Sequence, residues 1–154
     1  RGSRDKSQEC NGMKFDYPVC LQEYINQGLE FQRNGRLEES IALYKKALIQ
    51  MPDNSCLHNN LGVALRKQGC FSEAVASYQK AIESDPEYAD AYYNLGNAFQ
   101  STGEQEKAIR CYEMTIELCP HHAPAYQNLA TVYLEMGLFE KHMEYFRNAL
   151  KYIE

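Results

Sequence analysis

Glycine, proline and asparagine recur at a fixed spacing of 34 residues along most of this chain. Four series share that spacing and run in one register. Their members are Gly35, Gly69, Gly103 and Gly137; Pro52, Pro86 and Pro120; Gly28, Gly62 and Gly96, with Ala130 in the fourth place; and Asn26, Asn60, Asn94 and Asn128. A period of this length is typical of proteins in which one supersecondary unit stacks on the next. We therefore expect four repeats, at 21–54, 55–88, 89–122 and 123–154.

Each repeat has the pattern of two helices joined by a short turn. In the third repeat, apolar and small residues recur every three or four positions, as they do on one face of a helix. The first helix carries Tyr92, Leu95, Gly96 and Phe99, and the second carries Ala108, Tyr112 and Thr115. Gly103 separates the two, because glycine readily takes the left-handed conformation after a helix end. Pro120 stops the second helix, since proline cannot continue the hydrogen-bond ladder. The short connection predicts antiparallel neighbours, with Gly96 opposite Ala108.

The four units resemble tetratricopeptide repeats, whose pattern is an aromatic, Leu-Gly, an aromatic, Ala, an aromatic, Ala and Pro. Repeat three supplies Tyr92, Leu95, Gly96, Phe99, Ala108, Tyr112 and Pro120. Repeat two supplies His58, Leu61, Gly62, Leu65, Ala74, Tyr78, Ala81 and Pro86. Repeat one supplies Tyr24, Gly28, Phe31, Tyr44, Ala47 and Pro52, and repeat four supplies Tyr126, Leu129, Tyr133, Phe146 and Ala149. The departures are Gln27, Ser40, Ala130 and His142, and tryptophan is absent.

This resemblance covers about residues 21–154. It implies an all-α fold: a right-handed α-solenoid of four tetratricopeptide repeats, built from eight antiparallel helices. It also implies a protein–protein interaction module with a scaffold or adaptor role.

Residues 1–20 lie outside the repeats, and we expect them to form a non-repeat N-terminal arm. Met13, Phe15 and Tyr17 alternate with charged residues, which predicts an extended segment. The arm either docks loosely on repeat one or lies in a groove, its own or a neighbour's, as a ligand would. Residues 1–3 resemble a cloning remnant.

The composition excludes several classes of function. Charged residues interrupt every apolar run well before the ~20 residues that a membrane span needs. A net charge of -5 without a basic run disfavours nucleic-acid binding. The six cysteines form no C-x-x-C pair, and the chain is long enough to fold on hydrophobic burial. We therefore predict free thiols in a reducing compartment, and a cytoplasmic location with the nucleus also open.

No catalytic residue, cofactor or metal site is predicted, and we expect the chain not to be an enzyme. The sequence has no Gly-rich phosphate loop and no nucleophile elbow. Cys119, His121 and His122 are the only local group resembling metal ligands. A structural zinc site needs four ligands in close pairs, and this group falls in a predicted turn. His58 occupies a core aromatic position and is interpreted as packing.

The first helices of the repeats should line the concave side of the solenoid. There the four asparagines of the repeat series would form a ladder. An amide side chain both donates and accepts, so the ladder could pair with the backbone of an extended peptide. In the family such asparagines do hold extended peptides, as in the repeat domain of O-GlcNAc transferase. The alternative is that these asparagines are only solvated. The predicted peptide-binding residues are Asn26, Asn60, Asn94, Asn128, Tyr93, Asn97, Arg33, Arg66 and Lys67.

The last helix carries an apolar pair, Met143 and Leu150, that has no following repeat to contact. Earlier repeats hold Ile41 and Leu48, Val75 and Ile82, and Ile109 and Ile116 at these places. An uncovered apolar face is an interface or a liability. Either the chain is a fragment whose next helix covers the face, which we favour, or the face forms a homodimer. A further alternative is a substrate-presenting domain of a larger enzyme, such as a glycosyltransferase. The sequence does not identify the protein or peptide ligand.

Overall fold

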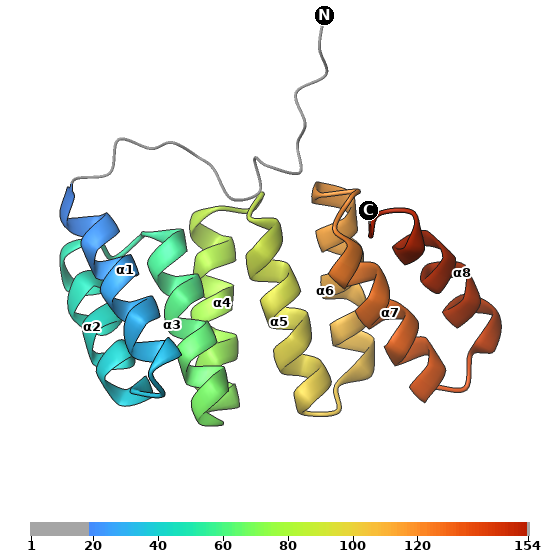
Figure 1. Cartoon of the computed structure of the whole chain (residues 1–154), viewed down its shortest axis with the longest axis horizontal. Coiled ribbons are helices and arrows are strands. Elements are labelled where there is room, and N and C mark those ends of the chain that lie inside the picture. Colours follow the sequence, from blue (N-terminus) through green and yellow to red (C-terminus); the bar gives the residue numbers. More distant parts are fainter. Residues whose placement is uncertain (1–18, 154) are drawn as a thin grey trace, which may run out of the picture.

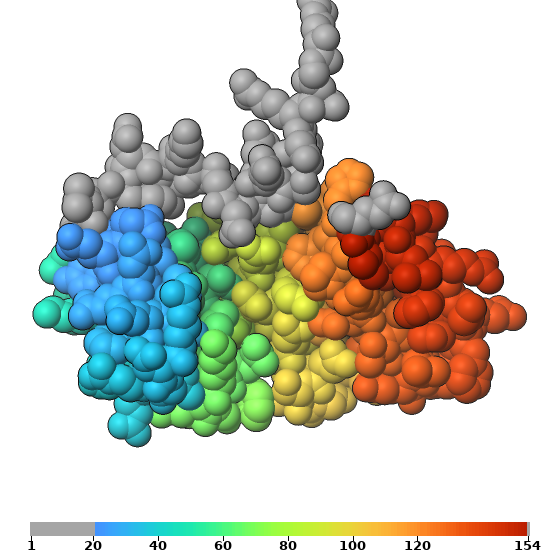
Figure 2. Space-filling view, viewed as in Figure 1, coloured from blue at the N-terminus to red at the C-terminus, as the bar shows by residue number. Residues whose placement is uncertain are grey.

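The computed structural model describes residues 19–153, and within that range it contains eight α-helices and no strand. They are α1 (Val19–Arg33), α2 (Leu37–Gln50), α3 (Ser55–Gln68), α4 (Phe71–Ser84), α5 (Ala89–Ser101), α6 (Gln105–Leu118), α7 (Ala123–Glu135) and α8 (Phe139–Leu150). The helices follow one another along the long axis of the molecule (Figure 1, Figure 2). The all-α expectation is confirmed. The predicted arm lies outside the described residues, apart from positions 19 and 20, which begin α1.

Glycine ends the first helix of each repeat. Gly69 has a φ of 87°, in the left-handed region that side chains with a Cβ rarely adopt. Its N–H donates to Arg66 O at 3.0 Å, and the Cys70 N–H donates to Leu65 O at 2.9 Å. These two bonds satisfy the last carbonyl groups of α3 as a Schellman motif. The same positive φ recurs at Gly35, Gly103 and Gly137. The predicted helix breaks are therefore confirmed, for the predicted reason.

Each of α2, α4 and α6 ends two residues before a proline of the repeat series. Two of the following helices each have a polar side chain that caps their first turn. Asn54 Oδ1 accepts the Leu57 N–H at 2.9 Å at the start of α3. His122 Nδ1 accepts the Ala125 N–H at 3.1 Å at the start of α7. Such caps satisfy backbone donors that have no partner within their own helix.

A tyrosine ring of the second helix packs directly on the glycine of the first helix in repeats one to three. In repeat two Tyr78 is fully buried. A Cβ built on Gly62 would lie 2.5 Å from Cε1 of Tyr78, closer than real Cβ atoms come. The same contact joins Tyr44 to Gly28 and Tyr112 to Gly96. Because the ring occupies the space of a side chain, only glycine fits beneath it without a shift.

Repeat four departs from this contact. Ala130 stands at the place of the glycine and Phe146 at the place of the tyrosine. Phe146 is 44% exposed, whereas the three tyrosines are fully buried. His142 replaces the small residue that precedes the tyrosine position by four. Its Nδ1 donates to Ala130 O at 2.8 Å. Its ring also stacks on Phe146 with centroids 5.8 Å apart. The sequence departures therefore accompany an aromatic ring that is turned outward.

Successive repeats pack through the second helix of one and the first helix of the next. Contacts of this kind join α2 to α3, α4 to α5, and α6 to α7. The first helices also touch one another, since α3 contacts both α1 and α5. Each repeat therefore contacts its immediate neighbours, which is the packing of a solenoid. The solenoid expectation is confirmed, and it sets the first helices side by side.

Candidate functional site

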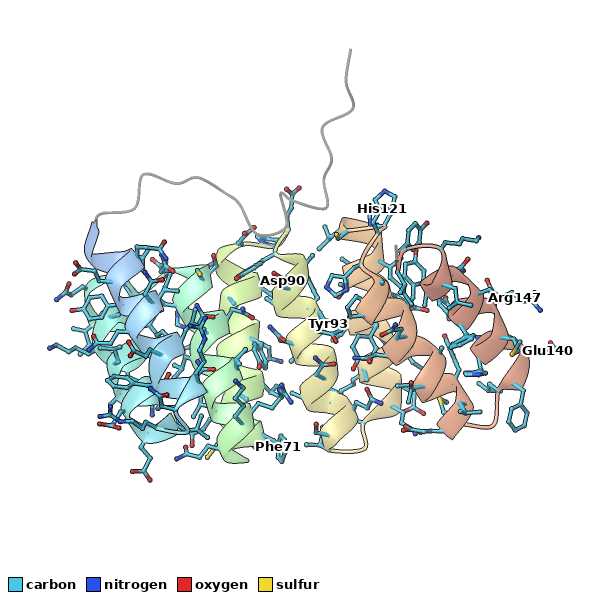
Figure 3. All side chains as sticks on the ribbon, in the orientation of Figure 1. Phe71, Asp90, Tyr93, His121, Glu140 and Arg147 are labelled. Carbon is cyan, nitrogen blue, oxygen red and sulfur yellow. The ribbon has the colours of Figure 1, made fainter. Side chains whose placement is uncertain are left out.

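The predicted peptide-binding residues and Asp90 lie on the first helices of the repeats, and we call this set of residues the first-helix surface. It is defined by Asn26, Arg33, Asn60, Arg66, Lys67, Asp90, Tyr93, Asn94, Asn97 and Asn128. These side chains come from α1, α3, α5 and α7. Figure 3 draws them as sticks and labels Asp90 and Tyr93 on α5. The binding role of the nine predicted residues stays a prediction.

Two asparagines of the repeat series bridge neighbouring first helices. The Asn94 amide on α5 donates to Asn59 Oδ1 on α3 at 3.0 Å. The Asn128 amide on α7 donates to Asn97 Oδ1 on α5 at 2.8 Å, and it also lies 3.2 Å from the Tyr93 hydroxyl. These amide donors are therefore used inside the protein. Among the described residues, no group donates to Asn94 Oδ1 or Asn128 Oδ1.

The other two asparagines interact within their own helices. Asn26 is exposed, and its Oδ1 accepts from Gln22 Nε2 at 3.0 Å. Asn60 is half-buried, and its amide lies 3.6 Å from Cys56 Sγ, a weak acceptor. Neither side chain joins two helices. The four members of the series thus divide into two that connect repeats and two that do not.

A polar network lies beneath the surface between α5, α6 and α7. The Tyr112 hydroxyl lies 2.8 Å from Asn97 Oδ1 and 2.8 Å from Gln100 Oε1. Asn128 donates to the same hydroxyl at 3.4 Å. The equivalent hydroxyls of Tyr44 and Tyr78 are buried without a hydrogen-bond partner. Sequence reasoning did not find this difference, although Asn97 has no asparagine at its place in the other repeats; the place of Gln100 is also a glutamine, Gln32, in repeat one.

His122 contributes a second cluster that sequence reasoning missed. Its ring lies 4.7 Å from the Tyr93 ring, and its Nε2 lies 3.7 Å from Asp90 Oδ1. Because Nδ1 accepts the Ala125 N–H, the proton of the neutral ring is on Nε2, which faces the carboxylate. The position of His122 directly before a helix was the available signal for its capping role.

Three predicted basic residues lie in the last turns of α1 and α3. Arg33 and Lys67 are exposed, and Lys67 Nζ donates to Gln32 Oε1 at 3.3 Å. Arg66 is half-buried, and its Nε has no hydrogen-bond partner among the described residues. Its positive charge lowers the pKa of Tyr78, though burial outweighs it. This corner of the first-helix surface is therefore positively charged.

Burial controls the ionisation of the tyrosines and cysteines near this surface. It raises the pKa of Tyr44 and Tyr78 to about 12, and it also raises the pKa of Tyr112, against the hydrogen bond from Asn128. Burial raises the pKa of Cys111 to about 11. These groups stay protonated at neutral pH, so they act there as neutral packing and hydrogen-bonding groups.

The predicted self-association residues lie at the opposite end of the molecule from α1. Met143 is 45% exposed and Leu150 is 55% exposed on α8. The equivalent of Met143 in repeat one, Ile41, is 8% exposed, because α2 packs against α3. The exposure of this face agrees with the pattern in the sequence.

Cys119, His121 and His122 do not form a metal site with other residues in the described range. No group of three or more His, Cys, Asp or Glu side chains between residues 19 and 153 is arranged to hold a metal ion. His58 is buried, and its Nε2 lies 2.6 Å from Pro52 O, in keeping with a packing role. None of the helices in this range is both long and apolar enough to cross a bilayer.

Stacked antiparallel helix pairs that share one polar surface define a helical-repeat module for protein–protein interaction. Models of the tetratricopeptide repeat match residues 28–69, 64–103, 89–122 and 111–142. The chain belongs to the tetratricopeptide repeat family. Repeats of this family act in general as non-catalytic modules that bind protein partners. No curated protein sequence matches the chain.

Solved structures of MamA are similar to this chain. One crystal structure of MamA is 31% identical, with a TM-score of 0.80, covering 86% of this chain and 77% of that chain. A second crystal structure of MamA is 29% identical, with a TM-score of 0.78, covering 96% and 75%. MamA from Desulfovibrio magneticus RS-1 is 20% identical, with a TM-score of 0.77, covering 85% and 74%; this likeness concerns the fold alone.

Proposed function

We propose that the first-helix surface binds an extended peptide segment of a partner protein. The observation that carries this proposal is the arrangement of Asn94 and Asn128. Their amide donors are held by neighbouring helices, while among the described residues their oxygens accept no hydrogen bond. Fixed acceptors lose little conformational freedom on binding, so they favour association. An extended peptide has backbone N–H groups that could donate to them.

This arrangement changes the expected chemistry of the ladder. The amides at Asn94 and Asn128 act mainly as acceptors for the peptide, because Asn94 already uses one of its two N–H donors and Asn128 donates to three neighbouring oxygens. Asn26 and Asn60 are free of contacts between helices and can both donate and accept. Tyr93 and Asn97 hold Asn128 in place, so their role in the proposal is to position the ladder as well as to contact the ligand.

The basic corner supports a preference for one kind of ligand. Arg33, Arg66 and Lys67 lie together, whereas Asp90 lies at the start of α5. None of the three basic groups forms an ion pair with a described residue. A peptide with an acidic residue near the last turns of α1 and α3 would supply the missing partner. We therefore propose that the ligand carries an acidic segment at that end.

The test uses peptides selected from a displayed library of unstructured sequences and then synthesised. Calorimetry compares wild type with Asn26→Ala/Asn60→Ala, which leaves the hydrogen bonds between helices intact. We expect the double variant to bind about thirtyfold more weakly, since each of the two lost hydrogen bonds contributes ~1 kcal/mol. Gln79→Ala, an exposed residue of α4, is the matched control and should bind as wild type.

Thermal unfolding of all three proteins separates binding from stability. Equal unfolding temperatures with a selective loss of affinity would support the proposal. Equal affinity of wild type and the Asn26→Ala/Asn60→Ala variant for every selected peptide would contradict it. A role as the substrate-presenting domain of a larger enzyme stays a prediction.

A further inference from the structure

The outer face of α8 carries a stripe of four large apolar side chains. Phe139 is 65% exposed, Met143 45%, Phe146 44% and Leu150 55%. They follow one another at spacings of four, three and four residues, so they lie on one side of the helix. The same spacing of apolar residues forms the contact line between paired helices in coiled coils. No described residue covers this stripe, which is an interaction surface by its size and continuity.

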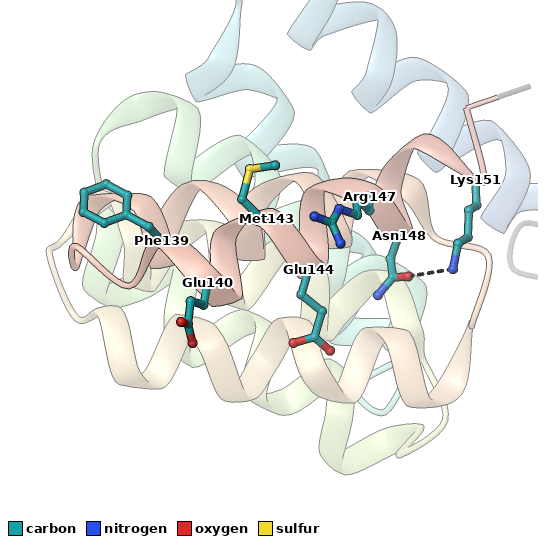
Figure 4. Close-up of a pocket in the computed structure, with 7 residues that line it drawn as sticks. All are labelled: Phe139, Glu140, Met143, Glu144, Arg147, Asn148 and Lys151. Atoms are coloured by element: carbon teal, nitrogen blue, oxygen red, sulfur yellow. Dashed lines mark hydrogen bonds between the residues drawn. The ribbon is translucent and has the colours of Figure 1, made fainter.

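Charged side chains flank the stripe in two separate groups. Glu140 and Glu144 lie on the first half of α8, and Arg147 and Lys151 lie on or just after the last turn (Figure 4). Together with Phe139, Met143 and Asn148 they line a hollow of about 630 Å³. Figure 3 shows the same separation, with Glu140 and Arg147 labelled on α8.

This separation is specific to the last repeat. The equivalent helices α2, α4 and α6 have no basic residue in their last turns. In α8 the spacing places like charges four residues apart, which is unfavourable within a single helix. None of Glu140, Glu144, Arg147 and Lys151 forms an ion pair with another described residue. Both charged groups are therefore available to an outside partner.

We propose that α8 pairs antiparallel with α8 of a second copy of this chain. A twofold axis would bring each apolar stripe against the other and reverse the direction of the second helix. The acidic half of one copy then lies beside the basic half of the other, with Glu140 of each copy facing Arg147 of the second copy. In antiparallel helix pairs, flanking positions on the same side meet in this way.

The charges select the orientation. In a parallel pair the charged flanks of the two copies would lie on opposite sides of the contact line, so neither the acidic nor the basic group would meet its counterpart. The dimer leaves the first-helix surface of both copies uncovered, since that surface lies on other helices. It would therefore present two such surfaces at once, and the inference does not depend on what they bind.

The pairing is expected to be weak. One helix pair buries less than the ~1,600 Å² of a standard interface, so we expect a dissociation constant on the order of 10–100 µM. Sedimentation equilibrium of the full chain across that range measures the mass. The expected result is a rise from 17.8 kDa toward twice that mass with increasing concentration.

Charge reversal identifies the face and the orientation. Glu140→Arg leaves Glu144 as the only acidic residue flanking the stripe. Arg147→Glu leaves Lys151 as the only basic one. Each single variant should dimerise about tenfold more weakly, because it places like charges across the axis. An equimolar mixture of the two should restore dimers. The double variant Glu140→Arg/Arg147→Glu should restore homodimers as well.

Two controls match the changes in net charge. Glu117→Arg and Arg110→Glu alter exposed residues of α6 and should dimerise as wild type. Circular dichroism checks that every variant is folded. Wild type that stays monomeric at about 1 mM would overturn the proposal and leave the face to a different partner. A dimer that neither single variant weakens, or one that the mixture fails to restore, would overturn it too.

Discussion

Two tyrosines at equivalent places in neighbouring repeats provide a matched test of the polar network. Tyr78 and Tyr112 are both fully buried, and each packs on the glycine of its repeat. They differ in the surroundings of the hydroxyl, which for Tyr78 include the Arg66 charge. The Tyr112 hydroxyl has acceptors at 2.8 Å in Asn97 and Gln100, whereas the Tyr78 hydroxyl has no partner. Substituting phenylalanine therefore removes the same atom from two opposite environments.

The expected changes in the free energy of unfolding have opposite directions. Tyr112→Phe removes a hydroxyl with close partners and leaves Gln100 Oε1 without its donor, so it should destabilise by about 1–2 kcal/mol. Tyr78→Phe removes a buried polar atom that has no partner, so it should be neutral or stabilise by up to about 1 kcal/mol. The two variants should differ by roughly 2 kcal/mol. At a urea dependence of about 2 kcal/mol per molar, their midpoints would lie about 1 M apart.

Urea unfolding followed by circular dichroism measures this difference directly. Equal slopes for both variants and wild type would show that the midpoints report stability alone. The Gly62 and Gly96 contacts remain in both variants, so packing on the glycine cancels in the comparison. The reasoning would be refuted if the two variants lost the same stability, or if Tyr78→Phe lost more than Tyr112→Phe.

Three further predictions concern stability. Gly62→Ala should destabilise by about 1–2 kcal/mol, because the new Cβ meets the buried Tyr78 ring and the strain exceeds the gain in helix propensity. Its counterpart Ala130→Gly should destabilise by about 1 kcal/mol through the lower helix propensity of glycine. A higher melting temperature for Gly62→Ala would contradict the first. Burial raises the pKa of Tyr44 and Tyr78 to about 12 from an ordinary value near 10. Their contribution to the free energy of unfolding is therefore complete below pH 10 and is lost as the pH rises toward 12. The loss is up to about 1.4 kcal/mol per pH unit for each group. Unfolding titrations at constant temperature would show this loss, and a flat profile between pH 10 and 12 would count against it. Asn128→Ala should destabilise by about 1–2 kcal/mol through its bonds to α5, as thermal unfolding would reveal.

The repeat period was sufficient to predict the helices and their breaks. Gly69 and its equivalents lie in the left-handed region because the chain must turn there, and glycine alone does so without strain. The close packing at Gly62 was also predictable from the small residues, although the sequence pattern did not identify Tyr78 as the ring that fills the space. Periodicity determines which residues share a face, and these features follow from that face.

The hydrogen bonds of the first-helix surface were less predictable. Asn94 bonds to Asn59, which is 35 residues away in the sequence, and that contact depends on how two helices cross. Hydrogen bonds require agreement within a few tenths of an ångström, whereas a 34-residue period fixes only the order of the helices. The pairing of His122 with Tyr93 has the same origin, since it depends on where the start of α7, capped by His122, lies against α5.

The outward ring of Phe146 has a mechanical consequence. Stability in a stack of repeats is approximately a sum of repeat terms and contacts between neighbours. Repeat four lacks the buried ring on glycine that each earlier helix pair has, and α8 packs against α7 with no further repeat beside it in the described residues. A molecule held at both ends and stretched would yield first at α8 and then unzip toward α1. Each repeat of 34 residues would release roughly 110–120 Å of chain. The extension would therefore increase in discrete steps, and the step at the lowest force would belong to the carboxyl-terminal repeat.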